Sequence, residues 1–334
     1  MPSTVVVGGF FGDEGKGKII SYLSKKDNPS IVVRGGAGPN AGHTIKDGNT
    51  TYKVRMLPSG FLNKNTKVMI GPGVVVNPDI FFKEIQEFGA SGRTFLDKHC
   101  GIIEQSHLDQ DSKGGLKEKI GSTGSGTGPA NAERAMRTLK MAKDVESLSS
   151  YVIDVPDEVN SALKDQKKVL IEGTQGTHLS LWHGTYPFVT SKDVTASGIC
   201  ADVGIGPKHV DEVLVVFKAY LTRVGSGPMP NELSAEETEE KGWAEFGTVT
   251  GRPRRAAEFD FDLARRAIML NSATQLAITK LDVRFPECAG VKSFNDLSDE
   301  AKSFIKNIEV KLQVSVTLIG TGPLVDDVID IRSV

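Results

Sequence analysis

The residues with the most evident chemical potential lie in one stretch near the N-terminus, VVVGGFFGDEGKGKIIS, at residues 5–21. Five glycines accompany two acids and two lysines there: Asp13, Glu14, Lys16 and Lys18. The β-branched run Val5–Val7 predicts a buried strand, and a helix is predicted from about Lys16 to Leu23. Backbone N–H groups at a helix start bind anions, and nearby lysines add positive charge. The stretch therefore predicts a polyphosphate site.

This stretch differs from the standard phosphate-binding loop. The pattern G-x-x-x-x-G-K runs from Gly12 to Lys18, but Ile19 follows where a Ser or Thr normally binds magnesium. Asp13 and Glu14 would repel a phosphate unless one carboxylate binds the metal ion or handles a proton. The alternative is a glycine turn with solvated charges. The density of glycines, lysines and acids favours the chemical interpretation.

Two further glycine-rich loops follow predicted strands. The strand Ile31–Val33 leads to a loop with Asn40 and His43, and the strand Lys168–Ile171 leads to Gln175. Because parallel strands end at the same edge of a sheet, we expect these loops to lie beside the first one. A lone loop histidine is more often incidental, but this position favours a functional His43.

Two segments nearer the C-terminus suggest ligand contacts. Residues 247–255, GTVTGRPRR, combine small and hydroxyl residues with three arginines, which predicts an anion clamp, with a basic surface turn as the alternative. A strand is predicted over Leu276–Leu281, and its end, with Lys280 and Asp282, resembles the base-reading motif of GTPases. One carboxylate can accept both N–H donors on the guanine edge, which adenine lacks. Asp282 would therefore select GTP over ATP.

The composition favours an α/β enzyme over a protein that binds nucleic acid or membranes. The 334 residues are 39% hydrophobic, and a net charge of −2 comes from interspersed charges of both signs. No apolar run approaches the ~20 residues that span a bilayer, and we expect no signal peptide. Three scattered cysteines, Cys100, Cys200 and Cys288, indicate a reducing cytoplasm. Since glycine loops alternate with strands throughout, we expect a single domain over residues 1–334, on a large, mainly parallel sheet.

These motifs resemble those of the adenylosuccinate synthetase family. Residues 12–18 match the family signature GDEGKGK without a break, and NAGHT, EGTQG and GTVTGRPRR match further family segments in the same order. Phe10 and Phe11 stand where the family usually has Gln and Trp. The resemblance covers nearly the whole chain, whose length is similar to the short archaeal-type form.

The resemblance implies a ligase that joins IMP and L-aspartate to adenylosuccinate, while GTP gives GDP and phosphate. This is the first committed step of AMP synthesis from IMP, and it passes through O6-phosphorylated IMP. Asp13 would remove the N1 proton of IMP and would bind Mg²⁺ together with the Gly42 carbonyl. His43 would donate a proton or hydrogen bond to the leaving β-phosphate. Lys16 would stabilise the charge of the phosphoryl group during its transfer, and Gln175 would hydrogen-bond the purine edge.

The resemblance also implies two sets of contacts and a homodimer. The residues implied to bind GTP are Gly12, Asp13, Glu14, Gly15, Lys16, Gly17, Lys18, Gly42, His43, Thr44, Arg254, Lys280, Leu281, Asp282, Gly320, Thr321 and Gly322. The residues implied to bind IMP or aspartate are Asn40, Thr123, Arg137, Gln175, Leu179, Thr190, Val224, Thr248, Val249, Thr250, Gly251 and Arg252. Arg137 would reach the IMP phosphate in the neighbouring subunit, so the active enzyme would be a homodimer.

Two other functions stay open at this point. A GTP-binding switch protein would share the phosphate loop, but the missing Ser or Thr after Lys18 and the separate arginine and glutamine loops count against it. The other is a viral-type relative that acts on dGMP. That group departs from Asp at the position of Asp13, so this residue favours IMP.

Overall fold

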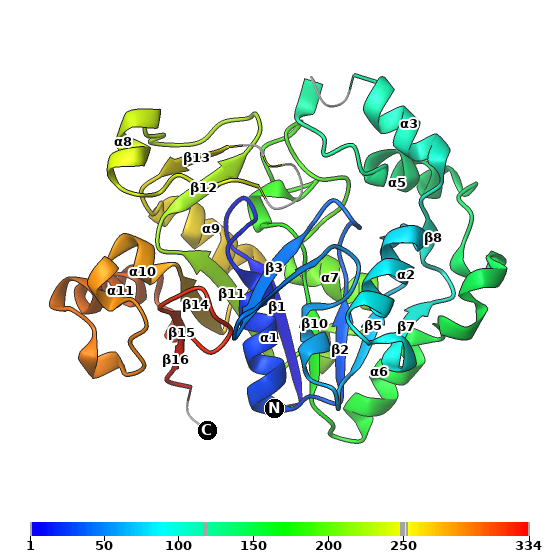
Figure 1. Cartoon of the computed structure of the whole chain (residues 1–334), viewed down its shortest axis with the longest axis horizontal. Helices are drawn as coiled ribbons and strands as arrows, with labels where there is room; N and C mark the ends of the chain where they lie inside the picture. The colour runs from blue at the N-terminus through cyan, green and yellow to red at the C-terminus, as the bar shows by residue number, and fades with distance from the viewer. Residues whose placement is uncertain (1, 116–118, 248–250, 252, 333–334) are drawn as a thin grey trace.

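A computed structural model describes residues 2–115, 119–247, 251 and 253–332. Its centre is a ten-stranded sheet with β1 near the middle, shown in Figure 1. The strands in spatial order are β16 (Val328–Asp330), β15 (Val316–Gly320), β14 (Gln275–Thr279), β11 (Glu212–Lys218), β1 (Ser3–Gly8), β10 (Val169–Glu172), β2 (Ile31–Arg34), β5 (Lys67–Ile70), β7 (Thr94–Asp97) and β9 (Val152–Ile153). Every neighbouring pair is parallel except β15 and β16. The prediction of an α/β fold on a mainly parallel sheet is confirmed.

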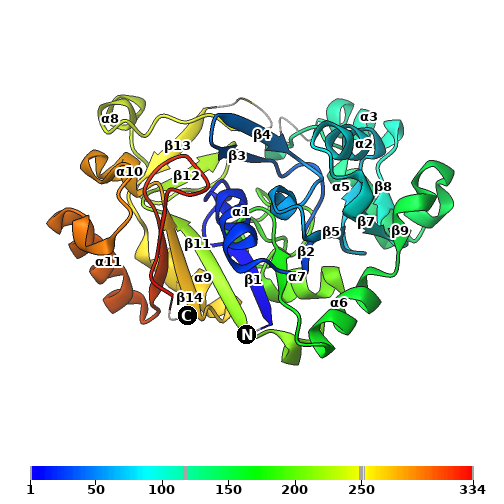
Figure 2. The same ribbon diagram turned by 60° about the horizontal axis from the view of Figure 1, so that its bottom comes forward.

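The sheet is buried on both faces, which explains its continuous apolar strands. Val5 and Val7 of β1 belong to one core cluster, whereas Val6 belongs to the cluster on the opposite face. The first cluster is covered by α6 (Val155–Lys164), α7 (Ala196–Val203), α9 (Phe261–Asn271) and α11 (Asp299–Leu312). The second is covered by α1 (Lys16–Asp27) and α2 (Pro78–Glu87), and Figure 2 shows α1 lying over the central strands.

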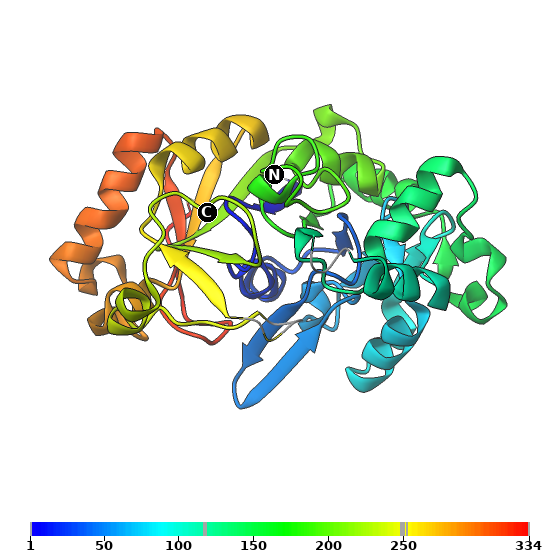
Figure 3. The ribbon, with the colours of Figure 1, turned by 90° about the horizontal axis from the view of Figure 1, so that it is seen from above.

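Smaller elements gather beyond the carboxyl ends of the central strands. They are the antiparallel pair β12 (Leu221–Val224) and β13 (Arg254–Ala257), the parallel pair β6 (Val75–Val76) and β8 (Gly101–Ile102), and the helices α3 (Gln105–Lys113), α5 (Thr127–Met136), α8 (Ala235–Glu240) and α10 (Leu281–Arg284). Figure 3 shows the hairpin of β3 (His43–Asp47) and β4 (Thr50–Val54) projecting from one side. Within the described ranges, none of the helices has the length and apolar character needed to cross a membrane.

In two elements a single residue sets the boundary. Helix α6 starts at Val155, because the Asp154 side chain accepts a hydrogen bond from the backbone N–H of Asp157 and so caps it. The two residues before Asp154 form β9. The strand predicted over Leu276–Leu281 stops at Thr279, because Lys280 adopts a left-handed φ of 59° that no strand can contain.

Candidate active site

A cavity of about 730 Å³ lies at the carboxyl edge of the sheet. The loops that follow β1, β2 and β10 line it, together with the end of β12, the segment after β12 and the end of β14. This edge is where parallel α/β sheets bind ligands. The predicted site residues that line the cavity are Gly12, Asp13, Gly15, Lys16, Gly17, Lys18, Asn40, Gly42, His43, Thr44, Thr123, Gln175, Leu179, Thr190, Val224, Arg254, Lys280 and Gly322.

In the first loop, Glu14 points into the protein and shapes the loop from inside. Its Oε1 accepts hydrogen bonds from the backbone N–H groups of Phe10 (3.0 Å) and Gly12 (2.8 Å). Its Oε2 lies 2.7 Å from the Lys16 Nζ, and both side chains are buried. Glu14 therefore curls the loop and holds the Lys16 ammonium at the cavity wall.

Asp13 faces the cavity from the tip of the same loop. It has a left-handed φ of 61°, a conformation that Asp tolerates better than most residues. Its Oδ2 forms an ion pair of 2.9 Å with Nη2 of Arg254, which begins β13. The proposed base and the arginine of the predicted anion clamp thus lie in direct contact.

Lys18 turns away from the phosphate loop toward the loop after β15. Its Nζ donates to the carbonyl oxygens of Gly322 (2.6 Å) and Asp327 (2.7 Å). Burial lowers the pKa of Lys18 to about 8, although Asp282 and Asp327 partly offset this effect. Lys18 thereby ties helix α1 to a segment that was predicted to contact guanine.

His43 lies over the first turn of α1. A Cβ on Gly17 would come within 2.6 Å of the His43 Cβ, so this approach requires glycine. The ring Nδ1 is 2.7 Å from Ser59 Oγ and 3.0 Å from Glu172 Oε1. Glu172 ends β10 and is fully buried. Neither Ser59 nor Glu172 was predicted to belong to the site, although Glu172 opens the EGTQG motif.

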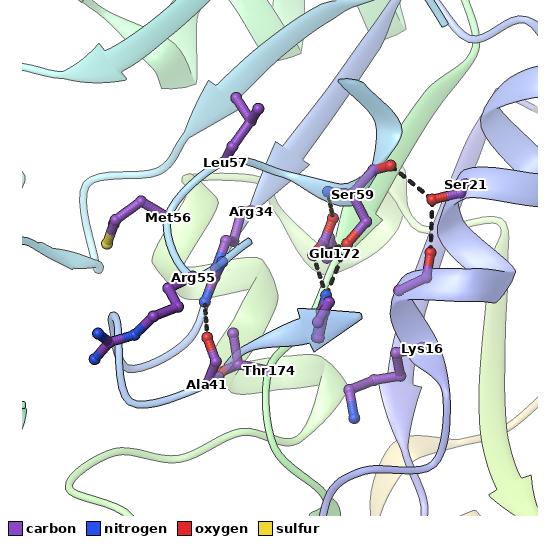
Figure 4. Close-up of polar contacts among 12 residues, drawn as sticks. Lys16, Ser21, Arg34, Ala41, Arg55, Met56, Leu57, Ser59, Glu172 and Thr174 are labelled. Atoms are coloured by element: carbon purple, nitrogen blue, oxygen red, sulfur yellow. Dashed lines mark hydrogen bonds and ion pairs between the residues drawn. The ribbon is translucent and has the colours of Figure 1, made fainter. Parts of the chain in front are cut away.

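Arg34 shapes the second glycine loop in the same way that Glu14 shapes the first. Its fully buried guanidinium donates to the carbonyl oxygens of Gly38 (3.1 Å) and Ala41 (3.2 Å), and Figure 4 shows the contact with Ala41. On the cavity side, Asn40 Nδ2 donates to Thr190 Oγ1 at 3.2 Å. The Nε2 of Gln175 is buried and has no hydrogen-bond partner among the described residues. An unpaired buried donor on the cavity wall is suited to a ligand acceptor.

Glu245 is a further site residue that sequence reasoning missed. Its Oε2 lies 2.6 Å from Lys218 Nζ and also pairs with Arg254, and its Oε1 lies 3.5 Å from Lys280 Nζ and accepts from Tyr220. Burial by itself would raise the pKa of Glu245, but the three cations hold it well below its usual range. Glu245 thus joins the arginine segment to the end of β14. It stands between Trp243 and Phe246, and no motif of the sequence marks it.

The predicted guanine site contains one carboxylate oxygen without a partner. Asp282 Oδ1 is buried and has no hydrogen-bond partner among the described residues, and burial raises the pKa of this group. Leu281, its neighbour in the chain, and Thr321 are buried. Neither these two residues nor Gly320 and Asp282 line the cavity. Thr279 donates to the Glu14 carbonyl at 2.6 Å, which joins the end of β14 to the phosphate loop.

Several predicted residues stand apart from the cavity. Arg137 is exposed at the end of α5 and does not line it, and Gly251 is exposed as well. Thr248, Val249, Thr250 and Arg252 lie outside the described residues. Their assignments remain predictions.

The two phenylalanines that replace Gln and Trp have different surroundings. Phe10 is in the core, 4.7 Å from Phe217 and 5.2 Å from Phe259 between ring centroids. Phe11 lies at the cavity wall, with the Arg223 guanidinium 4.3 Å from its ring centroid. Such a cation–π contact needs only an aromatic face, so Phe11 can make it in place of the Trp that is usual at this position.

The residues present fit a magnesium ion shared with a nucleotide. Magnesium prefers oxygen ligands, and in nucleotide enzymes it binds one or two carboxylates plus substrate phosphates. Asp13 offers a carboxylate at the cavity, and Gly42 lines the same cavity with its backbone. Among the residues with described positions, no group of three or more His, Cys, Asp or Glu could hold a metal ion. This arrangement matches an ion that phosphate oxygens would help to hold.

The fold and the site define the chain as an α/β nucleotide-dependent enzyme with a modified phosphate loop and several substrate loops around one cavity. The adenylosuccinate synthetase family model matches residues 5–146 and 137–287. The chain belongs to the adenylosuccinate synthetase family, as its sequence predicted.

Relatives and solved structures agree with this membership. The adenylosuccinate synthetase of Methanococcus vannielii is 54% identical over 337 residues, covering 100% of both chains. That of Methanocaldococcus jannaschii is 55% identical, covering 99% of this chain and 97% of its own. The fully ligated synthetase from Plasmodium falciparum has a TM-score of 0.91 at 28% identity and covers 98% of this chain and 99% of that one.

A second solved structure with a similar fold contains dGMP. The succinoaminodeoxyadenylate synthetase of cyanophage S-2L, bound to dGMP and to dATP as an energy donor, has a TM-score of 0.83 at 26% identity. It covers 99% of this chain and 96% of that chain.

Proposed function

We propose that this protein joins IMP and L-aspartate to adenylosuccinate and converts GTP to GDP and phosphate. One observation carries the proposal: a single cavity brings Asp13, His43, Gln175 and Arg254 together, although they come from four separate loops. The family carries out this reaction, and the archaeal synthetases named above are similar to this chain over nearly their full length.

The first step requires a base, a phosphoryl donor and charge stabilisation. Asp13 takes the proton from N1 of IMP, and the electron density moves to O6, which attacks the γ-phosphorus of GTP. The bond from that phosphorus to the β,γ-bridging oxygen breaks, and GDP leaves. Lys16 and the loop amides stabilise the charge on the transferred group, and His43 donates to the leaving β-phosphate. A magnesium ion held by Asp13 and the Gly42 carbonyl would neutralise phosphate charge.

The second step replaces the phosphorylated oxygen by nitrogen. The amine of aspartate attacks C6, and the bond from C6 to O6 breaks. Phosphate therefore leaves with the oxygen that began on IMP. We assign the aspartate carboxylates to residues 247–255, of which Gly247 and Arg254 line the cavity. Arg254 must then exchange part of its pairing with Asp13 for ligands.

The substrate contacts follow from the same arrangement. Gln175 offers an unpaired donor, and Asn40, Thr123, Leu179, Thr190 and Val224 line the wall for IMP. Asp282 offers its unpaired Oδ1 to the two N–H donors of guanine. Glycine at residue 322 allows the close approach of Asp327, whose Oδ2 would lie 2.4 Å from an added Cβ.

We assign the broader organisation from the same family membership. Residues 1–334 act as one catalytic domain, and two copies form a homodimer in which Arg137 reaches the partner's IMP phosphate. The exposed position of Arg137 at the end of α5 supports this role. The cytoplasm is the compartment that suits three free, buried cysteines.

The test is phosphate release from GTP by the purified protein with Mg²⁺, measured with all substrates and with IMP or aspartate left out. We expect release only when both are present, and a large loss when ATP replaces GTP. Release without either would indicate a GTPase. Release with dGMP in place of IMP would move the substrate to that of the phage synthetase.

A further inference from the structure

A buried carboxylate, hydroxyl and imidazole form a connected group behind the cavity wall. Glu172 Oε1 accepts from Ser59 Oγ at 2.9 Å, and Oε2 accepts from the Ser59 backbone N–H at 2.6 Å. The Ser59 carbonyl in turn accepts from Ser21 Oγ of α1 at 2.8 Å. Figure 4 shows Glu172 and Ser59 in contact beside Ser21. This group is fixed to both the sheet and the phosphate-loop helix.

The same carboxylate reaches His43. Glu172 Oε1 lies 3.0 Å from the ring Nδ1, and no part of the Glu172 side chain is exposed. The charged groups that act on Glu172 are His43 and Arg34. Burial disfavours the charged carboxylate, but the hydrogen bond and charge of His43 together with Arg34 lower the pKa of Glu172. Glu172 is therefore an anion at neutral pH.

The geometry fixes which ring nitrogen of His43 carries a proton. The Ser59 hydroxyl is used as a donor to Glu172, so Ser59 Oγ can only accept from Nδ1. A bare Nδ1 lone pair would also face the carboxylate oxygen at 3.0 Å, which is repulsive. Nδ1 must therefore bear hydrogen, and neutral His43 keeps Nε2 as an acceptor.

The other ring nitrogen is the one available to a ligand. His43 lines the cavity, and its contacts with Ser59 and Glu172 are both made through Nδ1. Because Nδ1–H is fixed, Nε2 can donate to a phosphate oxygen only after it takes up a second proton. A donating His43 is thus an imidazolium, and its positive charge faces the buried carboxylate.

We propose that Glu172 is a positioning residue for the phosphoryl-transfer step. It holds Nδ1–H of His43 and thereby orients Nε2 toward the β-phosphate. This inference rests on the proposed role of His43. If the proton moves, it passes from Nε2 to the leaving oxygen of GDP, and neutral His43 retains its proton on Nδ1. Ser59 holds the carboxylate in place from both of its oxygens.

The test compares Glu172→Gln with Glu84→Gln in kcat and KM. Glu84 is a matched control, because it is also buried but its oxygens accept from the backbone N–H groups of Arg55, Met56 and Leu57. In Glu172→Gln we expect kcat to fall by roughly 10- to 100-fold. The KM for IMP and aspartate should change by no more than about twofold. Glu84→Gln should change kcat by no more than about twofold.

A double mutant with His43 distinguishes a positioning role of Glu172 from a purely structural one. We expect Glu172→Gln to cause little further loss of kcat in a His43→Asn background, because both changes remove the same interaction. If Glu172→Gln folds poorly, Glu172→Asp should restore part of the lost kcat. Independent, multiplying losses, or a near-normal kcat in folded Glu172→Gln, would overturn the inference.

A readout without turnover distinguishes this inference from the proposed function. In ¹⁵N-histidine-labelled protein, the signals lost in His43→Asn identify His43 among the six histidines. We expect the neutral ring to keep its proton on Nδ1, and to populate the Nε2–H form in Glu172→Gln. A neutral wild-type ring with a bare Nδ1 would overturn the inference. Normal turnover in His43→Asn would instead overturn the proposed role of His43.

Discussion

Asp13 and Arg254 are joined by an ion pair of 2.9 Å across the cavity, and the same guanidinium also pairs with Glu245. The proposed base is thus neutralised by a residue of the segment expected to receive aspartate. Substrate binding must redistribute these contacts, since N1 of IMP and the aspartate carboxylates compete for the same groups. This relationship makes Asp13 and Glu245 the most informative positions to change.

Asp13→Ala should abolish turnover and leave the fold intact. Without the carboxylate nothing removes the N1 proton, and general-base loss costs about 10²–10⁴-fold in rate. The side chain is 27% exposed, so losing its ion pair should cost no more than about 1 kcal/mol. Steady-state kinetics and a thermal melt provide the two readouts. Near-normal kcat in a folded Asp13→Ala protein would contradict the base assignment.

Glu245→Gln should destabilise the protein and weaken its substrate affinities together. The change leaves Lys218, Arg254 and Lys280 around a neutral amide, and an uncompensated buried charge costs roughly 3–5 kcal/mol. Urea unfolding measures the loss of stability, and KM for GTP and aspartate reports the displaced Arg254 and Lys280.

A matched control for that change is Glu232→Gln. Glu232 also pairs with an arginine, Arg255, but its side chain is 37% exposed. Surface pairs contribute about 0–1 kcal/mol, so Glu232→Gln should alter stability little. Equal effects of the two substitutions would show that Glu245 has no special place in the site.

Much of the site could be predicted because its motifs are local and its strands are parallel. Asp13, His43 and Gln175 each follow a short apolar strand, and parallel strands bring their ends to one edge whatever the loops contain. The glycine at residue 17 also fits this logic, since His43 packs directly on it. The sheet and its catalytic edge therefore followed from strand spacing and glycine placement.

The pairing of charges could not be predicted in this way. Lys16 and Lys18 look alike in the sequence, yet one pairs with Glu14 and the other donates to carbonyls of the loop after β15. Glu245 acquires its importance from cations on three other segments. Such contacts depend on tertiary proximity, which no local pattern encodes.

Lys18 should make stability depend on pH above neutrality. Its folded pKa of about 8 lies below the unfolded value of 10.5, so the unfolded chain binds more protons between these values. The free energy of unfolding therefore rises with pH across this window. Below the window Lys18 does not contribute to its pH dependence. Relative to Lys18→Met, we expect the wild type to gain on the order of 1–3 kcal/mol from pH 8 to 10.5.

Urea unfolding of both proteins at several pH values measures this difference. Lys26→Met is the control, because Lys26 lies in the same helix but is exposed. The free energies of unfolding of the wild type and Lys26→Met should differ by a constant amount from pH 8 to 10.5. A constant difference for Lys18→Met as well would contradict the burial of its ammonium group.

Asp282→Asn should change the preferred base. An amide offers one acceptor and one donor, which no longer matches the two N–H donors of guanine but suits xanthine, where an oxygen replaces the amino group. We expect kcat/KM for GTP to fall by roughly 10²-fold or more and activity with XTP to appear. Unchanged GTP preference would place guanine recognition elsewhere.

The central claim is that the O6 oxygen of IMP is phosphorylated and then expelled as phosphate. The most direct measurement uses IMP labelled with ¹⁸O at O6, together with GTP, aspartate and Mg²⁺, and follows the label by mass spectrometry. The account predicts one ¹⁸O atom in each phosphate released, together with an equal amount of unlabelled adenylosuccinate. Unlabelled phosphate would mean that water attacks GTP, and it would contradict the proposed reaction.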